Sequence, residues 1–236
     1  KNLEFKELRS NLKTKKVLDI FIDDSHVYVS YEKNKDDCKH LHLAKSEINF
    51  NELKFIDIFK IENECTNDIQ SGRINKIVDN NDEYLLLSTS GDLLNNKSER
   101  DLKPQNDQSL YGKILTIRID DNSHGIFSKG HRNILGLSVN KQIIISTENG
   151  PKGGDEINLI ERNKNYGWDL ASFGKKYSSD DDTGEYLDHL SNGFEEPIFS
   201  FIPSIGISEI IKIDNNFDKD WKDNYLVGTL NDKHLL

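Results

Sequence analysis

Short runs of apolar and β-branched residues recur along the chain, separated by clusters of Asn, Asp, Gly and Ser. Runs of this length bounded by turn-forming residues are typical of β-strands, whereas the spacing of amphipathic helices is nearly absent. Several links are short enough for hairpins, which indicates antiparallel neighbours. The predicted strands are Val17–Asp23, His26–Lys33, His40–Ile48, Lys54–Glu62, Arg73–Asp79, Tyr84–Ser90, Gly112–Ile119, Ile126–Lys129, Ile134–Asn140, Gln142–Glu148, Glu156–Arg162, Pro197–Ile202, Glu209–Asp214 and Tyr225–Leu230.

Taken in fours, these strands repeat with a period close to that of β-propeller blades. One blade spans 17–62, the next 73–129, and a third 134–202 with a long insertion before its last strand. The last two runs begin a fourth blade, and Leu3–Leu8 is expected to be the last strand of a preceding one. The fold class predicted is all-β, a partial propeller of roughly three to four blades. Residues 1–236 would form one domain with incomplete terminal blades.

The unusual loops of the chain all occupy equivalent positions in this grouping. In an antiparallel meander, the loops after the second and the fourth strand of a blade emerge on the same face. We therefore expect these loops to converge on one mouth, where propellers usually carry their sites. They are Asp68–Arg73, Ser90–Asp92, Gly130–Asn133, Asn149–Glu156, Pro203–Gly206 and the position of Asn231.

Composition narrows the classes of function. The 236 residues are 35% hydrophobic and 31% charged, with a formal charge of −10, which argues against nucleic acid or an anionic membrane as the main partner. No run approaches the roughly 20 apolar residues of a membrane span. Met is absent, so a fragment or a processed product is expected. The oligomeric state is not determined by the sequence.

Two cysteines, Cys38 and Cys65, are too few for a disulfide scaffold and lack the spacing of a zinc site. Each follows a strand of the first predicted blade on the mouth side. A disulfide between them and a pair of free thiols both remain open.

Short motifs in the predicted loops occur in a fixed order. They are Ser90–Asp92, Tyr111–Ile114, Gly130–Asn133, Thr147–Asn158, Asn165–Trp168, Glu196–Ile198, Pro203–Ile205 and Leu226–Leu230. In this order they resemble the soluble PQQ-dependent glucose and aldose sugar dehydrogenases, the glucose/sorbosone dehydrogenase family. The resemblance implies a six-bladed propeller, periplasmic or secreted, that holds the quinone PQQ and Ca²⁺ in its mouth and acts on a small sugar or polyol.

The catalytic base of that family is a His in a loop reading Asp-His-Gln-Ser-Gly-Arg. Here the loop 68–73 reads Asp-Ile-Gln-Ser-Gly-Arg, so Ile69 occupies the position of the base. Isoleucine has no lone pair and cannot accept a proton. Asp92 matches the carboxylate that orients the missing His. Its alternative is a turn in which the carboxylate bonds its own backbone.

Cofactor contacts are implied at three positions. Arg132 and Asn133 match the pair at the carbonyl edge of PQQ, and a guanidinium suits both a carboxylated quinone and a developing negative charge. The alternative for Arg132 is a structural side chain that ties neighbouring blades. Asn231 stands where the family usually has Lys, which weakens the attraction for the carboxylates of PQQ.

Metal ligands are implied at four positions. Gly150 and Pro151 match the backbone carbonyls that bind calcium beside PQQ, and calcium prefers oxygen ligands. The alternative is a turn stabilised by Gly and Pro alone. Glu156 and Tyr166 match ligands of a second, structural calcium, and the alternative for Glu156 is a solvated carboxylate.

Two functions remain open. One is a PQQ-dependent oxidoreductase acting on the CH–OH groups of an aldose or another polyol. The other is a catalytically silent propeller that serves as a ligand- or partner-binding module. Ile69 and Asn231 favour the second, and restoring His and Lys at these positions is expected to raise activity if the site is otherwise intact.

Overall fold

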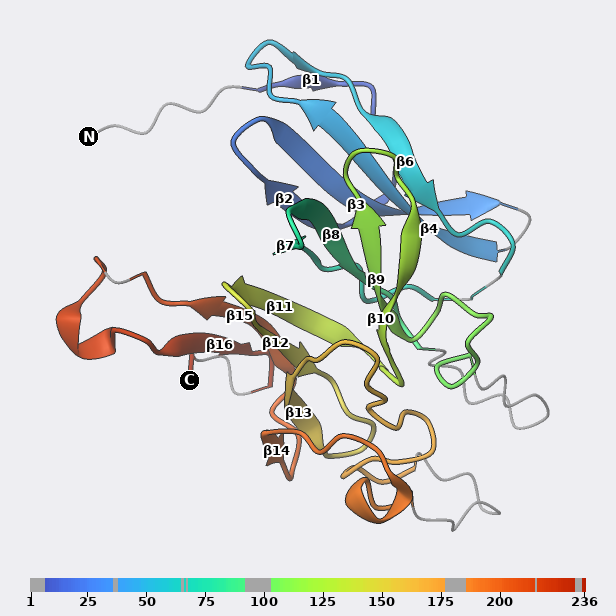
Figure 1. Cartoon of the computed structure of the whole chain (residues 1–236), viewed down its shortest axis with the longest axis vertical. Coiled ribbons are helices and arrows are strands. Elements are labelled where there is room, and N and C mark those ends of the chain that lie inside the picture. Colours follow the sequence, from blue (N-terminus) through green and yellow to red (C-terminus); the bar gives the residue numbers. More distant parts are fainter. Residues whose placement is uncertain are drawn as a thin grey trace.

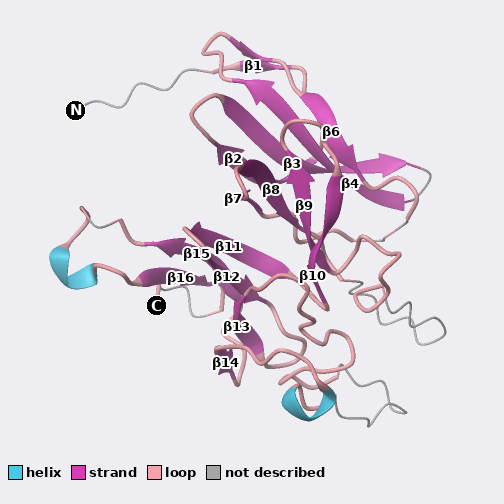
Figure 2. Cartoon of the chain, viewed as in Figure 1, coloured by secondary structure: helices cyan, strands magenta, loops and turns pink. Residues whose placement is uncertain are grey.

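The computed structural model describes residues 7–35, 38–64, 66, 68–91, 103–176, 186–214, 216–231 and 235–236. Within them, nearly all regular structure is antiparallel β-sheet (Figures 1 and 2). The helical elements of the described chain are the 3₁₀ turns η1 (Leu190–Asn192) and η2 (Lys219–Trp221). Neither has the length or the apolar character that a membrane span requires.

The strands form three four-stranded antiparallel sheets and two two-stranded sheets, and in each four-stranded sheet the spatial order follows the sequence. The first contains β2 (Lys16–Ile22), β3 (His26–Lys35), β4 (Cys38–Glu47) and β6 (Ile56–Lys60). The second contains β7 (Ile74–Asp79), β8 (Asp82–Ser88), β9 (Lys113–Arg118) and β10 (His124–Lys129). The third contains β11 (Ile134–Asn140), β12 (Ile143–Glu148), β13 (Asp155–Leu159) and β14 (Phe199–Phe201), and a fourth, two-stranded sheet contains β15 (Ile207–Lys212) and β16 (Tyr225–Thr229). This confirms the predicted grouping in fours.

The expected strand at Leu3–Leu8 lies mostly outside the described residues, and the described Leu8 belongs to no strand. Instead, β1 (Arg9–Ser10) pairs in parallel with β5 (Glu52–Leu53) in a separate two-stranded sheet. Pairs of two residues carry no alternating pattern, which is why the sequence did not predict them.

The innermost strands β2, β7, β11 and β15 lie side by side, and the sheets extend outward from them (Figure 1). Arg73, directly before β7, joins three of these strands. Its Nη1 lies 3.5 Å from Asp19 Oδ1 on β2 and 3.2 Å from Glu209 Oε2 on β15. The first, second and fourth sheets therefore meet at a shared hub, as blades do.

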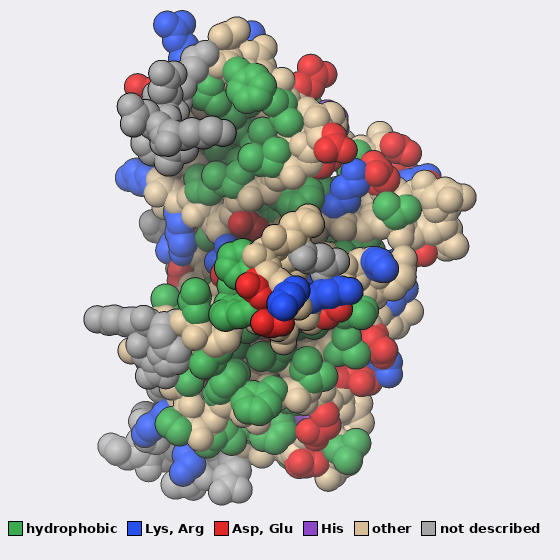
Figure 3. Space-filling model, turned by 90° about the vertical axis from the view of Figure 1, so that its left-hand side faces the viewer, with side chains coloured by type: hydrophobic (Ala, Val, Ile, Leu, Met, Phe, Trp, Pro, Cys, Tyr) green, Lys and Arg blue, Asp and Glu red, His purple; other side chains and the backbone are tan. Residues whose placement is uncertain are grey.

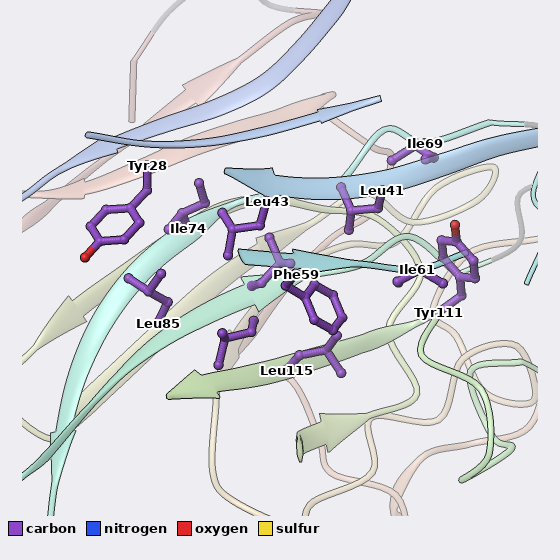
Figure 4. Packing of buried hydrophobic residues seen from close by; sticks show 12 residues of the cluster. Tyr28, Leu41, Leu43, Phe59, Ile61, Ile69, Ile74, Leu85, Tyr111 and Leu115 are labelled. Carbon is purple, nitrogen blue, oxygen red and sulfur yellow. The ribbon is translucent and has the colours of Figure 1, made fainter. Parts of the chain in front are cut away.

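Hydrophobic cores fill the spaces between successive sheets. Leu85, Leu86 and Leu87 on β8 are consecutive and all 0% exposed. Because side chains alternate across a strand, Leu85 and Leu87 join the core shared with the first sheet, whereas Leu86 joins the core shared with the third. The first of these cores includes Tyr28, Leu41 and other side chains of the first sheet (Figure 4). A sheet covered on both faces explains this unbroken apolar run.

The outer side of the first sheet is less completely covered. Val17, Ile20 and Ile22 on β2 are 47%, 58% and 61% exposed. Figure 3 views this side of the molecule and shows hydrophobic side chains gathered at its surface. Within the described chain, β2 therefore lacks the neighbouring sheet that covers β7 and β11.

Candidate functional site

The predicted mouth loops lie together at one end of the sheets. Ser90 Oγ accepts the backbone N–H groups of Gln70 at 3.0 Å and Ser71 at 2.8 Å. The N–H of Gly91 donates to the carbonyl of Arg132 at 2.7 Å. Hydrogen bonds thus join three loops of the second sheet: the one before β7, the one between β8 and β9, and the one after β10.

The same arrangement continues into the third and fourth sheets. Asn149 N–H donates to the Asn133 carbonyl at 3.0 Å, and Asn149 Nδ2 donates to the Ile207 carbonyl at 3.0 Å. Asn231 N–H reaches the Ile205 carbonyl at 3.1 Å. Every predicted mouth loop therefore has a described member at this end. Asp92, the carboxylate expected to orient the base, lies outside the described residues.

Ile69 faces the hydrophobic core. The residue is 0% exposed and belongs to the cluster between the first two sheets, where Figure 4 shows it beside Leu41. Its carbonyl accepts a hydrogen bond from Lys16 Nζ. Asp68 forms ion pairs with Lys16 at 3.5 Å and Lys39 at 3.7 Å. Packing and charge thus fix this loop with an apolar side chain turned inward, and no proton acceptor stands at position 69.

A partly open pocket with an empty volume of about 240 Å³ lies beside the Arg132 loop. It brings together five of the predicted site residues, while Asn133 and Asn231 are not among its walls. The lining residues are Arg132, Glu148, Asn149, Gly150, Pro151, Glu156, Tyr166, Trp168, Ala171 and Ser172.

Arg132 is held at the wall of this pocket by several contacts. Its guanidinium carbon lies 5.3 Å from the centre of the Trp168 ring, a cation–π contact. Its Nη1 donates to the Asn149 carbonyl at 2.8 Å, and its backbone N–H donates to Glu148 Oε1. A cation fixed beside open space is suited to an anionic or carboxylated ligand.

Other lining residues of the pocket are suited to a cation. Glu156 is only 8% exposed. Burial, and then the neighbouring Glu148 carboxylate, raise the pKa of Glu156. Among the described residues, no N–H or O–H group donates to the carbonyl oxygens of Gly150 or Pro151. Calcium takes oxygen ligands of these kinds, so the donors present fit the ion.

Two observations show which groups could serve as ligands of a calcium ion here. No group of three or more His, Cys, Asp or Glu side chains in the described chain is arranged to hold a metal ion. A calcium ion here would therefore depend on backbone carbonyls. The Tyr166 hydroxyl donates to the Leu159 carbonyl at 2.6 Å and accepts the Glu161 N–H at 3.0 Å, so its phenol is used within the protein.

Asn133 and Asn231 are placed differently from Arg132. Asn133 is 1% exposed, and its Nδ2 donates to Gln70 Oε1 at 3.0 Å. Its buried Oδ1 has no donor among the described residues, and the residue does not line the pocket. Asn231 is exposed and lies against Gly206, in the loop before β15. The structure therefore separates Asn231 from the pocket at Arg132.

Sequence reasoning missed Glu148, which lies within the quoted segment Thr147–Asn158 and ends β12. The only signal available was an acidic residue closing a buried strand next to Gly150 and Pro151. It also missed Lys113, which is 0% exposed. Lys113 Nζ donates to the carbonyls of Lys103, Pro104 and Tyr111 at 2.6, 3.1 and 2.9 Å. Burial lowers the pKa of Lys113 to about 8.

Cys38 is disulfide-bonded, so the alternative of a free thiol is wrong for this residue. Cys65, the other cysteine of the sequence, lies outside the described residues. The segments that carry them are adjacent, because Lys39 N–H donates to the Thr66 carbonyl at 2.9 Å. Sequence spacing alone could not show this proximity.

The sequence profile of the Glucose / Sorbosone dehydrogenase family matches residues 16–236. The chain therefore belongs to this family, as the order of its loop motifs predicted.

Curated relatives match part of the chain. The aldose sugar dehydrogenase YliI of Escherichia coli (strain K12) is 34% identical over 113 residues, which cover 47% of this chain and 30% of that protein. The uncharacterized protein slr1608 of Synechocystis sp. (strain ATCC 27184 / PCC 6803 / Kazusa) is 33% identical over 146 residues, 56% of this chain and 35% of the relative. The chain thus spans about a third of the length of these relatives.

Solved structures confirm the propeller fold. A glucose dehydrogenase crystal structure aligns with a TM-score of 0.77 and 23% identity, covering 94% of this chain and 69% of the other. The PQQ-bound aldose sugar dehydrogenase from Streptomyces coelicolor aligns with a TM-score of 0.62 and 20% identity, covering 95% of this chain and 63% of the other. At these identities the likeness concerns the fold.

Proposed function

We propose that the chain forms part of the mouth of a quinoprotein propeller that binds PQQ beside calcium and takes a sugar or another polyol. The observation that carries this proposal is the pocket that gathers Arg132, Gly150 and Pro151. The names of the E. coli and Streptomyces relatives support the cofactor and the substrate class.

Each group of the pocket would have a separate task. The Arg132 guanidinium would pair with carboxylates of the quinone. The carbonyls of Gly150 and Pro151 would bind calcium. The buried Glu156 would contribute negative charge only when a bound cation offsets the burial that raises its pKa. When bound, PQQ supplies a carbonyl group that accepts hydride from a CH–OH carbon. The hydroxyl proton still needs an acceptor, and Ile69 provides none.

A second function, that of a catalytically silent binding module, is favoured by the burial of Ile69. A positioned general base typically contributes about 10² to 10⁴ in rate, so its absence removes most turnover. The structure also changes the expectation for Ile69→His with Asn231→Lys. An imidazole at position 69 would enter the core, so we expect this pair of substitutions to leave turnover absent.

A periplasmic or secreted location is part of the proposal. Disulfides form and persist in oxidising compartments and are rare in the cytosol. The disulfide at Cys38 therefore supports export.

Equilibrium dialysis of the purified protein against PQQ, with calcium and with a calcium chelator, tests whether the protein binds the cofactor. We expect saturable, calcium-dependent binding that Arg132→Ala weakens by about tenfold or more. Arg162→Ala is the matched control, since that exposed guanidinium pairs with Asp79 outside the pocket. Absence of binding with calcium present would overturn the proposal.

Sugar-dependent dye reduction tests the catalytic half on the same samples. With PQQ and calcium bound, we expect no appreciable reduction with aldoses. Robust turnover would refute the silent-module function while leaving the binding site intact, and would require a base other than position 69.

A further inference from the structure

One carboxylate in the lining of the pocket, that of Glu148, makes two contacts with the neighbouring loop. Glu148 is 4% exposed. Its Oε1 accepts the backbone N–H of Arg132, and its Oε2 lies 3.1 Å from His131 Nδ1. We propose that Glu148 is a positioning residue, which fixes the Gly130–Asn133 loop so that the Arg132 guanidinium faces the ligand. This inference rests on the proposed role of Arg132.

The far side of His131 is fixed as well. Its Nε2 lies 2.8 Å from Ser128 Oγ on β10, and its ring stacks on Tyr166 with centres 4.7 Å apart. Both ring nitrogens of His131 are thus within hydrogen-bonding distance of a partner, Glu148 on one side and Ser128 on the other. The loop is therefore anchored to β10 at one end and to β12 at the other.

This row of Ser, His and Glu has the order of a nucleophilic triad. Ser128, however, is 1% exposed and His131 is 0% exposed. No substrate can reach the hydroxyl, and Ser128 is not among the pocket walls. The row therefore holds the loop in place and does not form a nucleophile.

Glu148 and Asn149 contact Arg132 at its backbone and at the end of its side chain, respectively. Glu148 receives the backbone N–H, while the Asn149 carbonyl receives Nη1 of the guanidinium at 2.8 Å. The end of β12 thus fixes both the backbone of Arg132 and the position of its guanidinium group. Such preorganisation reduces the loss of side-chain freedom on ligand binding.

Glu148→Gln is the discriminating substitution. A carboxylate offers two acceptor oxygens, whereas an amide offers one acceptor and one donor group. If the amide oxygen keeps the Arg132 N–H, the NH₂ group replaces the carboxylate oxygen that faces His131 Nδ1, so the contact on that side of the loop changes. Glu195→Gln is the matched control, because its carboxylate pairs with Lys164 at 2.8 Å and does not line the pocket.

The first measurement needs no ligand. In a Trp221→Phe background, Trp168 is the only tryptophan of the sequence and contacts the Arg132 guanidinium. We expect Glu148→Gln to shift the emission of Trp168 and Glu195→Gln to leave it unchanged. Equal spectra for Glu148→Gln and its parent would overturn the proposal. This measurement decides the role of Glu148 even if the protein binds no PQQ, which would refute only the proposed function.

The second measurement is PQQ affinity by equilibrium dialysis with calcium present. We expect Glu148→Gln to weaken binding about tenfold, and Glu148→Gln with Arg132→Ala to bind no more weakly than Arg132→Ala alone. Additive losses would mean that Glu148 contacts the ligand or the calcium directly, and would overturn a positioning role. If Glu148→Gln fails to fold, Ser128→Ala removes the other anchor. It is expected to shift Trp168 emission in the same direction with a smaller loss of affinity.

Discussion

Two loops of the mouth are in contact but differ in what is buried beneath them: apolar side chains in one case and polar side chains in the other. The 68–73 loop and the 130–133 loop are joined by the hydrogen bond between Gln70 and Asn133. Beneath the first, Ile69 fills an apolar core. Beneath the second, Glu148 and His131 form a buried polar row that supports Arg132.

The difference lies in what is buried beneath each loop, and it bears on the proposed binding of a ligand. Burying a carboxylate and an imidazole costs free energy unless every polar group is satisfied, so such a row is kept where it positions something. An isoleucine in a core contributes to stability and to nothing outside the core. Under the proposed function, the group that holds the ligand and the position of the base therefore lie in different loops, and they can be changed separately.

The largest expected effect is at Ile69. Ile69→Ala should lower the free energy of unfolding by about 2–5 kcal/mol, because a buried side chain is removed from a packed cluster. Urea denaturation followed by circular dichroism would measure it. Val17→Ala, at an exposed position of β2, is the control and should cost far less. A loss below about 1 kcal/mol at Ile69 would show that this loop is not part of the core.

Lys113→Met tests the support of the 130–133 loop, the second loop of the comparison. Lys113 holds the Pro104 carbonyl, which also accepts the Gly130 N–H at 3.1 Å, so it supports the Arg132 loop from behind. Three carbonyls would lose a donor, and we expect a loss of at least about 2 kcal/mol at pH 7.

The same variant carries a pH signature. The pKa of Lys113 is about 8 in the folded chain against an ordinary value of 10.5. Between these values the unfolded chain binds the extra proton, so the Lys113 contribution to the free energy of unfolding rises with pH across this window. Denaturation at pH 7, 9 and 10.5 should show this rise in the parent relative to Lys113→Met. Parallel curves would contradict the lowered pKa.

A smaller effect is expected at Ser90, whose hydroxyl accepts two backbone N–H groups of the 68–73 loop. Ser90→Ala leaves the N–H groups of Gln70 and Ser71 without their acceptor and should cost about 1–2 kcal/mol. Ser123→Ala, in an exposed turn, serves as the control for loss of a hydroxyl. Thermal melts of the two variants would give the difference.

The smallest change in stability is expected for an exposed ion pair, which serves as a reference for the other variants. Arg162 and Asp79 form an ion pair at 2.8 Å with side chains that are each 42% exposed. Asp79→Asn should change the free energy of unfolding by less than about 1 kcal/mol, and less still in high salt. A larger loss would mean that surface pairs between blades contribute as much as the mouth loops.

The blade pattern was predictable because strands and tight turns leave local signals. The run Leu85–Leu87 indicates a strand from its own residues, and its two-sided burial follows from the grouping into blades. The direction of the Ile69 side chain was not predictable, since it depends on residues such as Leu41 that are distant in sequence. The double use of Glu148 depends likewise on β12 meeting the Gly130–Asn133 loop. Arg132, Gly150 and Pro151 were found through motif order.

The carbonyl cage around Lys113 has a consequence for chemical labelling. An amine must be exposed and uncharged to react with an acylating reagent, and Lys113 is enclosed by the segment 103–111. Lys54, whose side chain is 77% exposed, should react at once. Lys113 should react only when that segment opens. The ratio of the two rates, followed by mass spectrometry, would measure how often the segment behind the Arg132 loop detaches from the blade.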